Sequence, residues 1–192
     1  PGTGIVELGR GEDFAWSATS AGSDLIDMRL EKICNPNGGK PAKHCTHYLF
    51  RGHCRAMRTE HFTETAYPKP GGQGAPAQLD HVIHLTRHGI VQGWTTSHGH
   101  PVAIVMQRST YGHDVDSVVG FLEWGEPALT HNVRSWMRHA NDINYTFNWF
   151  YVDNRDTGYF VSGWDPNRPR NVDPNLPTWG TGNAEWHGRL SF

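Results

Sequence analysis

The sequence has no long apolar run and no cluster of basic residues. Its longest apolar stretches have the length of β-strands, far short of the roughly 20 residues that a transmembrane helix needs. The formal net charge is -2, and lysine and arginine are dispersed along the chain. Because nucleic-acid-binding proteins concentrate basic residues on one face, we expect neither a nucleic-acid partner nor a membrane partner.

Familiar catalytic and metal-binding signatures are also missing. The chain contains no G-x-S-x-G nucleophile elbow, so a conventional Ser-His-Asp triad is not predicted. The 13 histidines are scattered along the chain. Stretches such as His98-Gly99-His100 and His113-Asp114 lack the regular ligand spacing of a metal centre. We therefore expect these histidines on the surface or in the sheets.

Cysteine is scarce, and the three residues lie close together in the sequence. We expect a disulfide between Cys34 and Cys54, with Cys45 free. Such a bridge contributes roughly 3 kcal/mol, chiefly by restricting the unfolded chain. Three neighbouring histidines raise the alternative of a zinc site, but structural zinc ligands usually come in close pairs such as CxxC, which are absent here. The disulfide favours an oxidising compartment, so a secreted or periplasmic protein is expected.

Glycine, proline and tryptophan are plentiful, with 22, 12 and 8 residues, which is typical of a loop-rich β protein. Two segments, 35–46 and 67–77, are too polar or too rich in proline and glycine for regular structure. Strand-like stretches cover most of the remainder. They are residues 4–8, 13–21, 24–33, 47–52, 79–89, 101–109, 144–153 and 157–164.

Two helices are predicted in the middle of the chain. The first covers about 116–124, with the Asp116 carboxylate as its cap, and the second covers about 127–141, with Pro127 in its first turn. In the second segment, apolar residues from Leu129 to Ala140 recur at helical spacing. Strands, a short helical pair at about 116–141 and further strands predict an α+β fold that is mostly antiparallel.

Four segments, in order, resemble the β subunit of the penicillin acylase (penicillin amidase) family. The first, Phe14–Asp27, contains W-x-x-T and D-x-x-D patterns, and the second is Thr86-Arg87-His88-Gly89. The third is Asn148–Asp153 followed by Gly158-Tyr159. The fourth, within residues 167–188, contains an arginine and then D-P-x-L-P, G-T-G and W-x-G. Only about residues 31–80 lack a clear counterpart.

This resemblance implies the four-layer αββα fold of N-terminal-nucleophile hydrolases. Residues 1–192 would be a single fragment of the β-subunit catalytic domain, lacking the upstream nucleophile segment and the C-terminal remainder. Such enzymes hydrolyse amides through an N-terminal serine whose own α-amine is the base. Position 1 is Pro1, which has no nucleophilic side chain. We therefore expect the nucleophile outside this chain, and the isolated chain to be inactive.

The resemblance also implies partners, a substrate class and site residues. The partners would be an α subunit and the rest of the β subunit, and the substrates N-acyl compounds of the penicillin, acyl-homoserine lactone or lipopeptide type. The Asn148 side chain and the Ser20 backbone N–H would form the oxyanion hole, and Arg168 would help to organise the active centre. A structural calcium ion would bind Asp24, the Ile26 carbonyl and Asp27.

Simpler interpretations remain for each of these residues. Asn148 could be an ordinary polar residue of a strand, Asp24 and Asp27 could cap turns, and Arg168 could lie on the surface. The whole protein could instead be a secreted β-rich binding module that stacks tryptophan and tyrosine on its ligand, or a non-catalytic relative that kept only the fold. Neither alternative needs Asn148 for its function.

Overall fold

The computed structural model describes residues 4–190, so Pro1 lies outside the described residues. The chain divides into two compact units. Unit 1 contains the described residues up to Ile26, Ser109–Pro169 and those from Trp186 onward. Unit 2 contains Asp27–Arg108 and Arg170–Glu185. No helix among residues 4–190 is long and apolar enough to cross a membrane.

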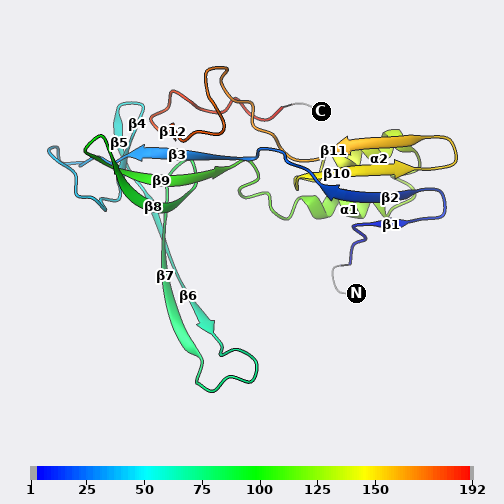
Figure 1. Ribbon diagram of the computed structural model, residues 1–192, viewed down its shortest axis with the longest axis horizontal. Helices are drawn as coiled ribbons and strands as arrows, with labels where there is room; N and C mark the ends of the chain where they lie inside the picture. The colour runs from blue at the N-terminus through cyan, green and yellow to red at the C-terminus, as the bar shows by residue number, and fades with distance from the viewer. Residues whose placement is uncertain (1–3, 191–192) are drawn as a thin grey trace. The chain divides into compact units, whose positions relative to one another are not determined.

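Unit 1 is built on a four-stranded antiparallel sheet with the order β1-β2-β10-β11 (Figure 1). The strands are β1 (Gly9–Arg10), β2 (Ala15–Ser20), β10 (Phe147–Val152) and β11 (Thr157–Val161). Two of the strands, β2 and β10, are distant in sequence but pair over six residues, from Phe147 opposite Ser20 to Val152 opposite Ala15. Successive side chains of each strand point to opposite faces of the sheet.

The inner face of this sheet packs against two helices, α1 (Ser117–Trp124) and α2 (Val133–Ala140), which lie side by side (Figure 1). Aromatic residues dominate the core between them. Trp124 stacks on Trp136 with ring centroids 5.1 Å apart, and the edge of Trp149 meets Trp124 at 4.9 Å. Glycine at position 158 lets α2 approach β11, because an added Cβ there would lie 2.6 Å from Val133.

The outer face of the same sheet carries exposed apolar side chains. Phe150 and Val152 of β10, with Tyr159 and Val161 of β11, are between 44 % and 53 % exposed. Asn148 lies on this face as well, since it is two residues from Phe150 along β10. The sheet of unit 1 therefore has one face covered by helices and one apolar face that nothing in residues 4–190 of unit 1 covers.

Both predicted helices are present, but their boundaries need correction. The second begins at Val133, not at Pro127, because Asn132 forms a capping box with Ser135: the Asn132 side chain accepts from the Ser135 N–H and the Ser135 hydroxyl accepts from the Asn132 N–H. Asp116 makes no side-chain cap at the first helix. Its carboxylate instead lies 2.7 Å from His113 Nδ1.

Unit 2 contains a six-stranded sheet with the order β12-β3-β9-β8-β7-β6 and a separate hairpin of β4 and β5. Four strands of unit 2 were not predicted: β5, β6, β8 and β12. Among them, β6 is polar and exposed along its length, and β8 is broken by a β-bulge between Val91 and Gly93. The bounds are β3 (Ile26–Lys32), β4 (His47–Phe50), β5 (His53–Ala56), β6 (Arg58–Ala66), β7 (Ala77–Leu85), β8 (Ile90–Ser97), β9 (His100–Arg108) and β12 (Thr178–Trp179).

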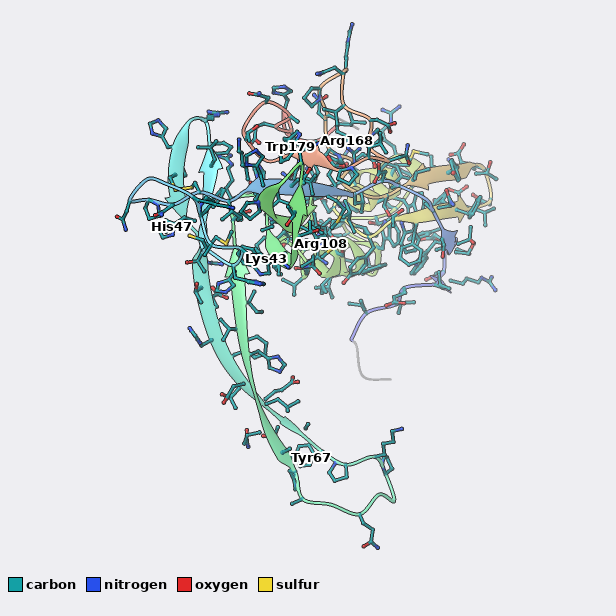
Figure 2. All side chains as sticks on the ribbon, turned by 60° about the vertical axis from the view of Figure 1, so that its left-hand side comes forward. Lys43, His47, Tyr67, Arg108, Arg168 and Trp179 are labelled. Carbon is teal, nitrogen blue, oxygen red and sulfur yellow. A yellow bond between two sulfur atoms is a disulfide. The ribbon has the colours of Figure 1, made fainter. Side chains whose placement is uncertain are left out.

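The hairpin of β6 and β7 is long and mostly exposed. The two strands pair in register over nine residues each, from Arg58 opposite Leu85 to Ala66 opposite Ala77. Tyr67 lies at its far end, where the proline- and glycine-rich segment forms the connecting loop (Figure 2). The expectation that residues 67–77 lack regular structure is confirmed except at Ala77, which begins β7.

The predicted cysteine pairing is confirmed. Cys34 and Cys54 form a disulfide, and Cys45 is free, with its Sγ donating to the Cys34 carbonyl at 3.2 Å. The bridge ties the chain just after β3 to β5. His98-Gly99-His100 is part of a tight β-hairpin, because His98 and Gly99 both have positive φ, as two-residue hairpin turns require. These two histidines therefore lie in the hairpin of β8 and β9, in line with the expectation of surface or sheet positions.

Candidate active site

Asn148 is held by two hydrogen bonds at the end of the unit 1 sheet where β2 ends and β10 begins. Its Nδ2 donates to the Ser20 carbonyl at 2.8 Å, and its Oδ1 accepts from the Tyr159 hydroxyl at 2.6 Å. Bonds to both ends of the amide fix its orientation. Within residues 4–190 no acceptor is found for the second hydrogen of Nδ2, which can therefore be offered to a ligand.

The Ser20 backbone lies beside this amide. The next residue, Ala21, donates its N–H to the Thr146 carbonyl at 3.3 Å. Because hydrogen-bonding residues alternate along an antiparallel strand, the Ser20 N–H points to the opposite edge of β2. On that edge β1 pairs only with Ala15 and Trp16. The structure therefore brings Asn148 and Ser20 together and, among residues 4–190, leaves the Ser20 N–H without a partner strand.

Arg168 lies near the same end of the sheet, bound to Asp24. Its Nη2 donates to the Asp24 carbonyl at 2.7 Å and lies 3.2 Å from the Asp24 carboxylate. Only 14 % of the Arg168 side chain is exposed, and its guanidinium lies 5.9 Å from the Trp186 ring centre. Arg168 is thus an ordered, largely buried residue and not a loose surface side chain.

Asp165 introduces a second carboxylate beside Arg168. Burial raises the pKa of Asp165, and the charge of Asp24 raises it further, whereas Arg168 opposes the shift. Asp165 lines a cleft of about 400 Å³ together with Tyr159, Val161 and Gly163. The cleft thus adjoins Tyr159, the residue that orients Asn148. Sequence reasoning included Tyr159 in a motif but assigned it no role.

Asp27, which the sequence predicts as a calcium ligand, is a buried residue of unit 2. Its carboxylate lies 3.4 Å from Nη2 of Arg29, which is itself fully buried. Ile26 begins β3, and its side chain is 42 % exposed. The oxygens of Asp24 and Asp27 have the hard character that calcium prefers, but each carboxylate has an arginine as its partner in the structure.

The Thr-Arg-His-Gly segment forms part of a buried charged cluster in unit 2. His88 lies between two carboxylates, with Nδ1 2.6 Å from Glu31 and Nε2 2.7 Å from Glu185. The Thr86 hydroxyl donates to Glu31 at 2.8 Å. The Glu31 and His88 side chains are at most 1 % exposed. Thr86 and His88 therefore have a structural role, since the buried carboxylate of Glu31 requires partners.

The sequence matches the profile of the family described as penicillin amidase over residues 1–192. The chain belongs to the penicillin amidase family. It is an amidohydrolase-family chain with an α+β, mostly antiparallel fold, similar to that of an N-terminal-nucleophile hydrolase.

Two penicillin G acylases resemble this chain over part of their own length. It is 28 % identical over 190 residues to penicillin G acylase of Escherichia coli, covering 98 % of this chain and 20 % of that protein. A solved structure of a thermostable penicillin G acylase from Alcaligenes faecalis superposes with a TM-score of 0.75 at 30 % identity. That match covers 98 % of this chain and 31 % of the other. The chain spans about a fifth of the length of the curated relative.

Proposed function

We propose that the protein containing this chain hydrolyses N-acyl amide bonds through an N-terminal serine outside residues 1–192. The observation that carries the proposal is the amide of Asn148, fixed by Ser20 and Tyr159 with one N–H still to offer. Membership of the penicillin amidase family supports the reaction class. The substrates would be N-acyl compounds of the penicillin, acyl-homoserine lactone or lipopeptide type.

In the proposed reaction, the serine hydroxyl attacks the amide carbonyl and its proton passes to the serine α-amine. The carbonyl oxygen becomes an anion and needs donors that are already in place. Nδ2 of Asn148 and the N–H of Ser20 would supply them. Asparagine suits this role because it donates hydrogen bonds without titrating. Arg168 would add positive charge at the same end of the sheet.

The partners would be an α subunit and the rest of the β subunit. Four apolar side chains on the outer face of the unit 1 sheet, from Phe150 to Val161, support this assignment. Exposed apolar patches of this kind mark interaction surfaces, and a second sheet packing on this face, with a helix layer of its own behind it, would complete a four-layer fold. The isolated chain of 192 residues would then hydrolyse nothing. The disulfide supports a secreted or periplasmic location.

Tyr159 provides the test of this proposal, as a positioning residue that acts through Asn148. Tyr159→Phe removes the hydroxyl that holds Oδ1 of Asn148. We expect the complete enzyme to lose about tenfold in kcat with little change in KM, because a misoriented oxyanion donor weakens transition-state stabilisation. Steady-state hydrolysis of a panel of N-acyl p-nitroanilides measures both constants.

Tyr145→Phe is the matched control, since the Tyr145 hydroxyl donates to the Asp114 carbonyl at an exposed position. It should leave kcat unchanged. If the wild-type enzyme cleaves none of the acyl anilides, the proposed function is wrong. Equal kcat values for the two variants would instead remove the assigned role of Tyr159 in orienting Asn148.

Calcium binding by Asp24, Ile26 and Asp27 stays a prediction, and we propose it for the complete enzyme with further ligands from another chain. Terbium, which replaces calcium in oxygen sites, should bind and show luminescence sensitised by nearby tryptophan. The double substitution Asp24→Asn/Asp27→Asn should abolish this signal, and chelation by EGTA should lower the melting temperature of the wild type alone. Undiminished terbium luminescence in the double variant would locate any such ion elsewhere.

A further inference from the structure

A histidine and two carboxylates meet at the ends of the two helices of unit 1. Glu123 is near the end of α1, His139 is near the end of α2, and Asp142 is the second residue after α2. One ligand atom from each residue lies within 4.8 Å of the others. The helices that carry them are held together by the stacked rings of Trp124 and Trp136.

The contact between His139 and Glu123 is close but is not a good hydrogen bond. Nδ1 of His139 lies 2.7 Å from Oε2 of Glu123. Nevertheless Oε2 is buried and has no hydrogen-bond donor in the described structure. The ring therefore does not direct an N–H at this oxygen, because a hydrogen bond needs alignment as well as proximity. A buried, unpartnered carboxylate oxygen is costly unless a cation compensates it.

The contact of the other ring nitrogen of His139 also indicates that Nδ1 carries no hydrogen. Nε2 lies 3.4 Å from the Leu129 carbonyl, which can only accept a hydrogen bond. The N–H of a neutral ring is therefore expected on Nε2, which leaves a lone pair on Nδ1, beside Glu123, that a metal ion can use. Histidines that bind metal ions usually donate their second N–H to a backbone carbonyl or a carboxylate in this way.

The off-axis contact fits two ligands of one ion. Zinc binds histidine nitrogen and carboxylate oxygen at about 2.0–2.2 Å, so two such ligands of a tetrahedral ion lie about 3.4 Å apart without pointing at each other. The 2.7 Å between Nδ1 and Oε2 would have to widen by about 0.7 Å when such an ion binds. The Asp142 carboxylate is exposed at the rim and supplies a third ligand.

We propose that Glu123, His139 and Asp142 form a binding site for a divalent metal ion, and that this ion is zinc. One nitrogen and two carboxylate oxygens suit zinc, whereas calcium and magnesium prefer oxygen ligands alone. Three protein ligands leave a coordination position for water. The ion links the end of α1 to the end of α2 and so stabilises the helical layer behind the aromatic core. This proposal is independent of the proposed amide hydrolysis.

The test is metal binding to the complete, metal-free protein. Cobalt, which replaces zinc, should produce visible d–d absorption bands of a low-coordinate site, and zinc should abolish them. Asp142→Asn is the first variant because its side chain is exposed and its loss should not disturb folding. We expect it to weaken zinc binding at least about tenfold, because a neutral amide is a poor zinc ligand. His139→Gln should remove the cobalt bands.

His113→Gln is the matched control, because His113 also lies 2.7 Å from a carboxylate, that of Asp116, at an exposed position without a third ligand. It should bind cobalt and zinc like the wild type. Zinc should raise the melting temperature of the wild type and of His113→Gln, but not that of Asp142→Asn. The proposal is overturned if the wild type shows no cobalt bands, or if Asp142→Asn and His139→Gln bind as the wild type does. Hydrolysis measured in parallel with EDTA reports separately on the proposed function.

Discussion

Replacing Asn148 by alanine is expected to lower the kcat of amide hydrolysis by the complete enzyme about 10²–10³-fold, the usual cost of losing one oxyanion donor. The loss should fall mainly on kcat, because the donor acts on charge that develops only in the transition state. Asn148→Asp should be at least as damaging, since a carboxylate repels the oxyanion and has no N–H to donate. Steady-state kinetics with an N-acyl p-nitroanilide measures both variants.

Asn154→Ala serves as the matched control for this experiment. Asn154 lies in the turn between β10 and β11, is exposed, and belongs to the same hairpin as Asn148. Its removal should leave kcat within about twofold of the wild type, as expected for a surface site away from the reacting groups. Unfolding curves of all variants establish that the fold is retained. An Asn148→Ala enzyme that keeps wild-type kcat would exclude the oxyanion role.

Asn148→Ala also distinguishes an amidase from a binding module or a non-catalytic relative. A secreted binding module or a non-catalytic relative does not use Asn148 chemically, so Asn148→Ala should leave ligand binding by such a protein intact. For an amidase, substrate binding should also survive, but turnover should be lost. The decisive comparison is therefore between kcat and binding affinity in one variant, and not the loss of a single signal.

The second large effect concerns stability. Trp149→Ala is expected to lower the free energy of unfolding by about 3–5 kcal/mol, which is typical of truncating a buried tryptophan. The Trp149 side chain packs on Phe121, Trp124 and Phe147, and its Nε1 donates to the Ser162 hydroxyl at 2.8 Å. Since most domains are stable by only about 5–15 kcal/mol, this loss is a large fraction of the total. Urea unfolding monitored by circular dichroism measures it.

Trp149→Phe distinguishes ring packing from the hydrogen bond. Phenylalanine fills most of the space and loses the bond to Ser162, so a cost of about 1–2 kcal/mol is expected. A loss of the same size for both variants would show that the bond, and not packing, makes the main contribution. Because Trp149 adjoins Asn148 in β10, Trp149→Phe should also reduce catalytic activity less than Trp149→Ala does.

Local signals in the sequence predicted much of the fold. The cysteine spacing indicated the bridge between Cys34 and Cys54, and proline and glycine marked the loop at the end of the long hairpin. Helical spacing placed Trp136 and Ala140 on the buried face of α2. The start of α2 was predicted too early because the cap at Asn132 acts against continuation of the helix, even though Pro127 is itself compatible with a first turn.

The residue types and their order determined the fold class, the cysteine pairing and the family, since each depends on patterns within short segments. Only the tertiary structure decided which distant residues meet. Asn148 contacts Ser20 because β10 pairs with β2, which lies more than a hundred residues earlier in the sequence. Asn148 contacts Tyr159 because β11 is the other strand that pairs with β10. Glu123, His139 and Asp142 converge because two helices pack through their tryptophans. Such contacts depend on strand register and helix packing, which no local spacing in the sequence encodes.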